Sequence, residues 1–86
     1  INGFLGVEEL VLHPVLFPNP TSGTVQLFLP GEFEVIVTDL SGIVVAKYAH
    51  DSESTFSFEG HAAGTYIIQF VGSSNVATQR IHYSGN

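Results

Sequence analysis

The sequence predicts an all-β fold, an antiparallel Ig-like β-sandwich of about seven short strands. Segments that alternate between apolar and polar residues recur at intervals of about ten residues from Thr24 onward. Gly, Pro, Asn, Asp and Ser cluster between these segments, as is typical of turns. After Phe17, no segment shows the sustained period of about 3.6 residues that an amphipathic helix requires. An open barrel is the alternative arrangement of the same strands.

The stretch Phe17–Thr24, which we call the corner, divides the chain into two parts. Pro18 and Pro20 each restrict φ to about −65° and favour extended conformations in the residues before them. The two hydroxyl residues that follow can bond to nearby backbone, and Gly23 can adopt a positive φ. We therefore expect a stiff, non-helical corner that leads directly into a strand.

We expect residues 1–16 to be a linker and lead-in strand from a preceding domain, and residues 17–86 to form the sandwich. The lead-in strand would lie at an edge, where Pro14 is tolerated. A short helix over Val7–Leu12 is the alternative, but Pro14 would end it. The chain begins with Ile1 and has no signal peptide, so we expect it to be part of a longer protein.

The strands follow from the alternation, and the turns follow from the residues between them. The predicted strands are Val11–Phe17, Thr24–Leu29, Phe33–Asp39, Ile43–Ala49, Thr55–Glu59, Thr65–Val71 and Val76–Tyr83. The predicted connections are Pro30-Gly31, Asp39–Gly42, His50–Glu53, Gly60–Gly64 and Gly72–Asn75. In one of these turns, Asp39 is expected to accept a hydrogen bond from the backbone two residues later, with Gly42 in the left-handed region.

The alternation also predicts which aromatic residues face the core. The predicted core comprises Phe56, Phe58, Tyr66, Ile68 and Phe70. Tyr48 and Tyr83 are the aromatic residues that we expect to point outward, and Phe28 is ambiguous.

The composition excludes several functions. The 86 residues carry a net charge of −6, and Lys47 and Arg80 are the only strong bases, which argues against binding to nucleic acid or to an anionic membrane surface. The chain has no cysteine, so disulfides, thiolate metal sites and cysteine nucleophiles are excluded. No apolar run approaches the roughly 20 residues that span a membrane.

We expect no enzymatic activity and no cofactor. The only plausible general bases are His13, His50, His61 and His82, and we interpret all four as surface histidines because neither G-x-S-x-G nor H-E-x-x-H is present. A calcium site could use Asp51, Glu53 and Glu59, or Asp39 with a turn carbonyl. Since these residues lack the dense spacing of calcium loops, we interpret them as solvated acidic loops.

A carbohydrate-binding module would have a similar size and fold. Such modules usually present coplanar aromatic rings to the sugar. This chain has no Trp, and most of its aromatic residues fall at positions that the core would occupy. Core packing is therefore favoured, with Tyr48 and Tyr83 as the candidates for sugar contact.

Four blocks of the sequence resemble a known family. The corner resembles the Y/F-P-N-P-T-x-G opening of the type IX secretion C-terminal sorting domain (the Por secretion tail, type A). Val35–Val45 resembles the V-x-V-Y-D-x-x-G-R-x-V block of that family, although Thr38 and Ile43 depart from it. Gly60–Ile68 resembles L-P-A-G-x-Y-x-V, and Thr78–Ile81 lies where the family has T-x-K and a hydrophobic residue.

The resemblance implies a non-catalytic signal domain that follows a secreted cargo domain in Bacteroidetes-type bacteria. It implies transit through the periplasm, recognition by the type IX outer-membrane translocon and its shuttle protein, and cleavage by a surface sortase. The cargo would then be at the cell surface or secreted. The residues implied in recognition are Pro18, Asn19, Pro20, Gly23, Asp39, Gly42, Gly64, Tyr66 and Arg80. An accessory carbohydrate-binding or spacer module of an extracellular enzyme is the alternative.

Overall fold

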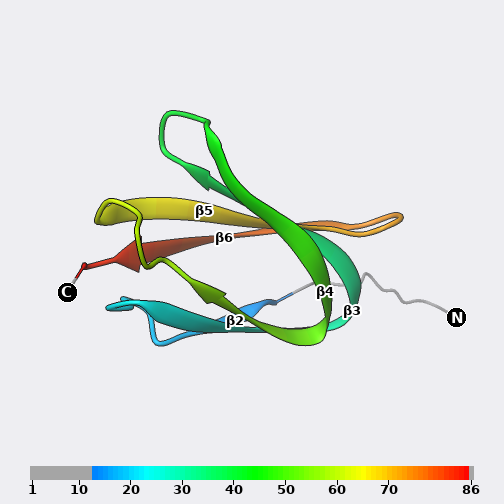
Figure 1. Cartoon of the computed structure of the whole chain (residues 1–86). Helices are drawn as coiled ribbons and strands as arrows, with labels where there is room; N and C mark the ends of the chain where they lie inside the picture. Colours follow the sequence, from blue (N-terminus) through cyan, green and yellow to red (C-terminus); the bar gives the residue numbers. More distant parts are fainter. Residues whose placement is uncertain (1–12, 86) are drawn as a thin grey trace, which may run out of the picture.

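The computed structural model describes residues 13–85, which form five β-strands and no helix. The strands are β2 (Val15–Phe17), β3 (Thr24–Asp39), β4 (Val44–Ser57), β5 (Gly64–Val71) and β6 (Val76–Tyr83). All pairings are antiparallel and belong to one curled sheet, in which β3 pairs with β2, β4 and β5, and β5 pairs with β6 (Figure 1). The predicted all-β antiparallel class is confirmed. Residues 1–12 of the linker and lead-in strand predicted over residues 1–16 lie outside the described residues, as does the alternative helix.

Two predicted turns are in fact bends inside long strands, so the structure has five strands where the sequence predicts about seven. Leu29 of β3 pairs with Ser52 of β4, and Glu32 pairs with Asp51. Pro30 and Gly31 are therefore the extra residues of a bulge, which bends a strand without ending its pairing. The predicted connector over residues 50–53 likewise lies within β4.

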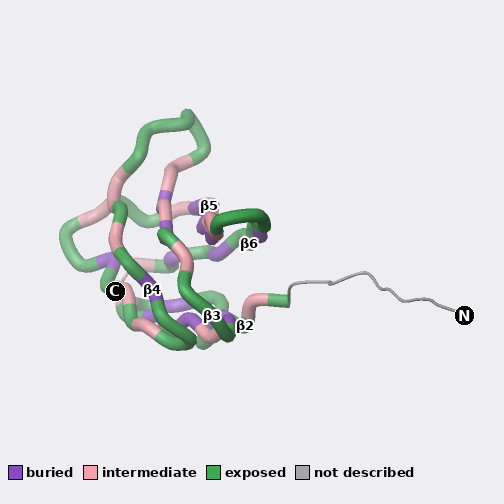
Figure 2. The backbone as a smooth tube through the Cα atoms, turned by 90° about the vertical axis from the view of Figure 1, so that its right-hand side faces the viewer, coloured by how far each residue is buried: buried purple, intermediate pink, exposed green. Residues whose placement is uncertain are grey.

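This bend folds the sheet into two facing halves. The first part of β3 pairs with β2 and with the end of β4, whereas the second part pairs with the start of β4 and with β5. Figure 1 shows β4 at the front, with two arms that diverge from the bend. Both halves contribute to a single core, with Val25 and Leu27 on one side and Ile68 and Phe70 on the other. Figure 2 shows buried positions along the strands of both halves.

The core agrees with the predicted alternation at most positions. Phe58, Tyr66, Ile68 and Phe70 are buried, and Phe56 is partly buried against them. The outward placement of Tyr83 is wrong, because its side chain is only 5% exposed. Tyr83 shares the inward face of β6 with Ala77 and Ile81, and its ring stacks on Phe58 with centroids 5.1 Å apart.

The two arms of β4 also touch through aromatic rings. Tyr48, which the sequence predicts to point outward, is partly buried against the core. Its ring is parallel to that of Phe56, with an interplanar angle of 2° and centroids 6.2 Å apart. The stack therefore joins the start of β4 to its end across the open side of the curl.

His50 is buried at the bend, so its interpretation as a surface histidine is wrong. Its Nε2 lies 3.0 Å from the carbonyl oxygen of Leu29 and must donate to it, because a carbonyl only accepts. Its Nδ1 lies 2.6 Å from Oγ of Ser54, which is 3.1 Å from the Tyr48 hydroxyl. These contacts satisfy a polar group that would otherwise be costly to bury. His13 and His82 are exposed, and His61 is partly buried.

Candidate functional site

Thr21 anchors the corner to the last strand. Its side chain is 1% exposed; Oγ1 donates to the carbonyl of Thr24 (2.7 Å) and accepts from the N–H of Gly23 (3.1 Å). The backbone N–H of Thr21 donates to the carbonyl of His82 (2.9 Å), and its carbonyl accepts from the N–H of Ser84 (2.8 Å). The predicted bonding of a corner hydroxyl to local backbone is confirmed. The attachment to β6 was not predicted, and Thr21 was not among the expected recognition residues.

Asn19 extends this attachment along the edge of β6. Its Oδ1 accepts a hydrogen bond from the N–H of His82 (3.2 Å). Its Nδ2 donates a hydrogen bond to the carbonyl oxygen of Arg80 (3.4 Å). One side-chain amide thus satisfies a donor and an acceptor that a neighbouring strand would otherwise pair. The flanking Pro18 and Pro20 are exposed, and the peptide bonds before both are cis.

The glycines of the predicted motif differ in their roles. Gly64 (φ +152°) and Gly42 (φ +94°) adopt positive φ, as expected. The prediction of a positive φ for Gly23 is wrong. A Cβ added at Gly23 would meet no atom within 4 Å. The Thr21 hydroxyl closes this turn instead, so the glycine need not adopt a left-handed conformation.

Asp39 organises the turn between β3 and β4. Its Oδ1 accepts from the N–H of Ser41 (2.9 Å), from the Ser41 hydroxyl (2.7 Å) and from the N–H of Ile43 (3.0 Å). The Ser41 hydroxyl contributes most to lowering the pKa of Asp39 below its ordinary value of 3.8, followed by the Ile43 N–H. The predicted bond to the residue two positions later is confirmed.

Strand register brings most of the motif residues to one end of the sheet. Gly64 pairs with Tyr83, and Tyr66 pairs with both Ile81 and Asp39. Figure 1 shows the corner, the start of β5 and the end of β6 together at the end of the molecule marked C. The turn that contains Gly42 projects away from this group in Figures 1 and 2. Tyr66 is buried, and its hydroxyl donates to the carbonyl of Ala62, so its role here is in packing.

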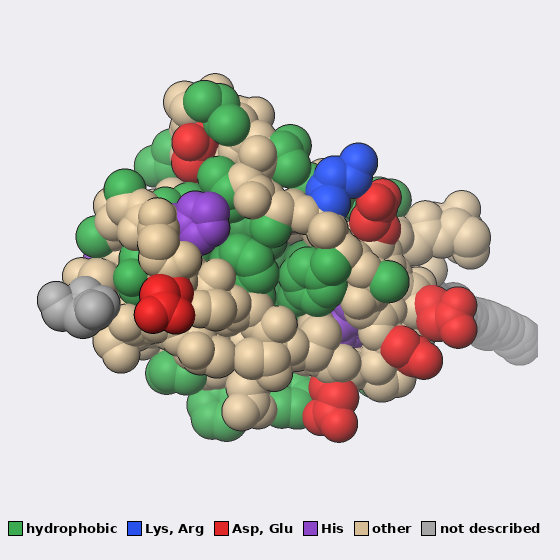
Figure 3. Space-filling model, viewed as in Figure 1, with side chains coloured by type: hydrophobic (Ala, Val, Ile, Leu, Met, Phe, Trp, Pro, Cys, Tyr) green, Lys and Arg blue, Asp and Glu red, His purple; other side chains and the backbone are tan. Residues whose placement is uncertain are grey.

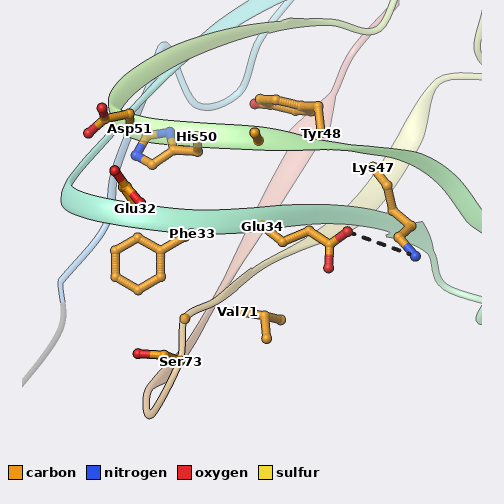
Figure 4. A pocket seen from close by; sticks show the side chains of 11 residues that line it. Glu32, Phe33, Glu34, Lys47, Tyr48, His50, Asp51, Val71 and Ser73 are labelled. Carbon is orange, nitrogen blue, oxygen red and sulfur yellow. Dashed lines mark ion pairs between the residues drawn. The ribbon is translucent and has the colours of Figure 1, made fainter.

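One hollow of the surface lies away from this group, and a smaller one lies beside it. An open hollow of about 590 Å³ lies beside the bend (Figure 4), and its lining includes Glu32, Glu34, Asp51 and Val71. Lys47 lies 3.9 Å from Glu34 at its margin. A smaller polar hollow of about 210 Å³ adjoins the corner, lined by Ser22, Gly23, Thr24, Ser57, Glu59 and Tyr83.

The candidate calcium ligands are not gathered around a common point. Asp51, Glu53 and Glu59 are exposed, and Asp39 is engaged in its own turn. Among residues 13–85, no three His, Cys, Asp or Glu side chains are grouped so that they could hold a metal ion. The same residues include no helix long and apolar enough to cross a membrane.

A comparison with protein families identifies the family to which the chain belongs. A family model, the secretion system C-terminal sorting domain, matches residues 15–83, from the start of β2 to the end of β6. The chain belongs to this family. A type IX sorting domain is a signal attached to an N-terminal cargo, and it marks that cargo for export to the cell surface or medium. No curated protein matches the chain.

Proposed function

We propose that this sorting domain directs its cargo from the periplasm through the type IX outer-membrane translocon, and that the recognised surface is the junction of the corner with β6. The observation that carries the proposal is the pairing of Asn19 and Thr21 with the edge of β6. Two sequence blocks of the family, about 60 residues apart, thereby form one surface.

The motif residues divide into those that a partner can touch and those that shape the surface. Pro18, Asn19, Pro20 and Arg80 are exposed. We infer that these four contact the translocon, its shuttle protein or the surface sortase. Of the remaining residues, Gly64 and Tyr66 shape the start of β5 beside β6, and Gly23 donates its backbone N–H to the Thr21 hydroxyl. Asp39 and Gly42 shape the separate turn between β3 and β4.

An Ig-like sandwich is supported by the bend of β3 and β4, which produces two facing halves around one core. The carbohydrate-binding alternative is not favoured, because neither of its two candidate residues presents a free aromatic ring to a sugar. Tyr83 is buried, and the ring of Tyr48 is stacked on Phe56.

The test is an export assay in a bacterium with type IX machinery. The chain is fused behind a signal peptide and a fluorescent reporter, and the reporter is measured in the periplasm, on the surface and in the medium. We expect export of the intact fusion and reduced export of an Asn19→Leu variant. Asn75→Leu, in the exposed turn between β5 and β6, is the matched control and should be exported normally. Retention of the intact fusion in the periplasm would refute the proposed function.

A further inference from the structure

We propose that the outer face of β3, β5 and β6 is the surface on which the domain docks onto a protein of the secretion machinery. The partner would present aliphatic side chains to Ile67 and a carboxylate to Arg80. The inference rests on the proposed sorting function and adds the chemistry of the partner to it. The central residues of this outer face are Ile36, Ile67, Gln69, Thr78 and Arg80.

Strand register places these side chains next to one another. Ile67 lies between Thr38 of β3 and Arg80 of β6. The next row of the sheet contains Ile36, Gln69 and Thr78. Ile68 and Ile81, which follow Ile67 and Arg80 in the chain, are buried in the core. Because side chains alternate along a strand, the central residues point away from the core.

The outer face is apolar at its centre and along one end. Ile36, Ile67 and Val71 are partly buried, and Val76 is 58% exposed. Their polar neighbours Thr38, Gln69 and Thr78 carry no charge. On the β3 side this face ends at the Lys47–Glu34 ion pair, because Lys47 pairs with Ile36 and Glu34 pairs with Val71. An apolar centre with charged residues only at its margin is typical of a protein–protein interface.

The positive charge of Arg80 indicates the chemistry of the surface that the partner presents. Within residues 13–85 the only ion pair joins Lys47 to Glu34, so Arg80 is the one strong base without a carboxylate partner. Its cross-strand neighbour Ile67 and the diagonal neighbours Thr65 and Gln69 are uncharged. Figure 3 shows several acidic groups on the side of the molecule that it presents, with one basic group beside an acidic one. Because β5 and β6 contain no acidic residue, the region around Arg80 is complementary to an acidic surface.

The corner favours docking on the face over pairing with the edge. Asn19 and Thr21 already occupy the hydrogen-bonding groups of β6 from the Arg80 carbonyl to the Ser84 N–H. A partner strand could not pair there without displacing the corner. The side chains of Ile67 and Arg80 remain accessible with the corner in place.

A second exposed apolar group lies on the opposite half of the sheet and serves as a control. Val15 and Phe17 are 54% and 53% exposed, and the ring of Phe17 stacks on Phe28. Phe28 pairs with Glu53, so this group lies next to a negative charge and does not share the complementarity of the outer face.

The experiment compares export of the full-chain reporter fusion among charge and shape variants. We expect Arg80→Glu and Ile67→Glu each to lower the exported fraction by about tenfold or more, the effect of losing an interface anchor. Arg80→Lys retains the charge and should remain within about twofold of the parent. Val15→Glu, on the opposite half, should also remain within about twofold. Circular dichroism melting of each purified chain identifies variants that lose the fold, and Ile67→Thr replaces Ile67→Glu if that variant unfolds.

The outcomes separate this inference from the proposed function. If the parent fusion is exported and Arg80→Glu is exported equally well, the outer face is not the docking surface, although the sorting function stands. An equal loss with Val15→Glu would likewise overturn the assignment to this face. If the parent fusion itself is retained, the sorting function fails and the inference fails with it.

Discussion

Replacing Thr21 with Val tests whether hydrogen bonding, and not packing, holds the corner. Val has nearly the shape of Thr but lacks Oγ1, so the bonds to the Thr24 carbonyl (2.7 Å) and from the Gly23 N–H (3.1 Å) are lost. A net loss of about 1 kcal/mol per bond predicts a fall of about 2 kcal/mol in the free energy of unfolding. For a domain of this size, that corresponds to a decrease of about 8–16 °C in the melting temperature.

The assay is urea or thermal unfolding followed by circular dichroism, with two controls. Thr21→Ser keeps the hydroxyl and loses one buried methyl, which should cost about 1 kcal/mol. Thr55→Val, at an exposed position of β4, should change the stability by less than about 0.5 kcal/mol. Hydrogen bonding predicts that Ser is tolerated better than Val, and packing predicts the reverse order. A Thr21→Val domain more stable than Thr21→Ser would therefore refute the reasoning.

Three further changes test the turns and the bend. Gly64→Val should lower the free energy of unfolding by roughly 1–3 kcal/mol because Gly64 has φ +152°. Gly23→Val should have little effect, because a Cβ at Gly23 would meet no atom within 4 Å. Equal urea midpoints for the two variants would contradict this. Asp39→Ala should lower the melting temperature at neutral pH but not in acid. Because folding lowers the pKa of Asp39, its contribution is present above about pH 4 and disappears as the pH falls through the folded-state value, so a difference that persists at about pH 2 would argue against it. His50→Ala should cost about 2–4 kcal/mol, since the ring is buried and bonded to Leu29; an unchanged urea midpoint would show that the bend does not depend on it.

The class of fold could be predicted because alternation is a local property. Phe58, Ile68 and Phe70 could be assigned to the core from their immediate neighbours alone. The number of strands could not, because Pro30-Gly31 has the same composition whether it ends a strand or bends one. That choice depends on the pairing of residues on both sides of it with β4, which is not visible in the local pattern.

The sequence motifs predicted the family, but not how the motif residues are arranged in space. The spacing of the motif blocks identified the corner and β6, and the family match confirms the family. The role of Gly23 was misjudged because a glycine after two hydroxyl residues predicts a positive φ, whereas the hydroxyl of Thr21 makes this unnecessary. The inward position of Tyr83 was missed because its stacking partner Phe58, just after the end of β4, is distant from it in the sequence.

The contact between the corner and β6 makes the proposed recognition surface a property of the whole fold. The bond from Asn19 to Arg80 joins residues 61 positions apart, and the bond from Ser84 to Thr21 joins residues 63 apart. Contacts of such separation form only after the chain between them has paired, because closing a long loop is unfavourable without the intervening structure. A partner that touches Asn19 and Arg80 together therefore binds a chain whose last strand is already in the sheet. A linear motif in the corner alone would be equally visible in an unfolded or truncated chain, and it would not require the side chain of Asn19 to bond with β6.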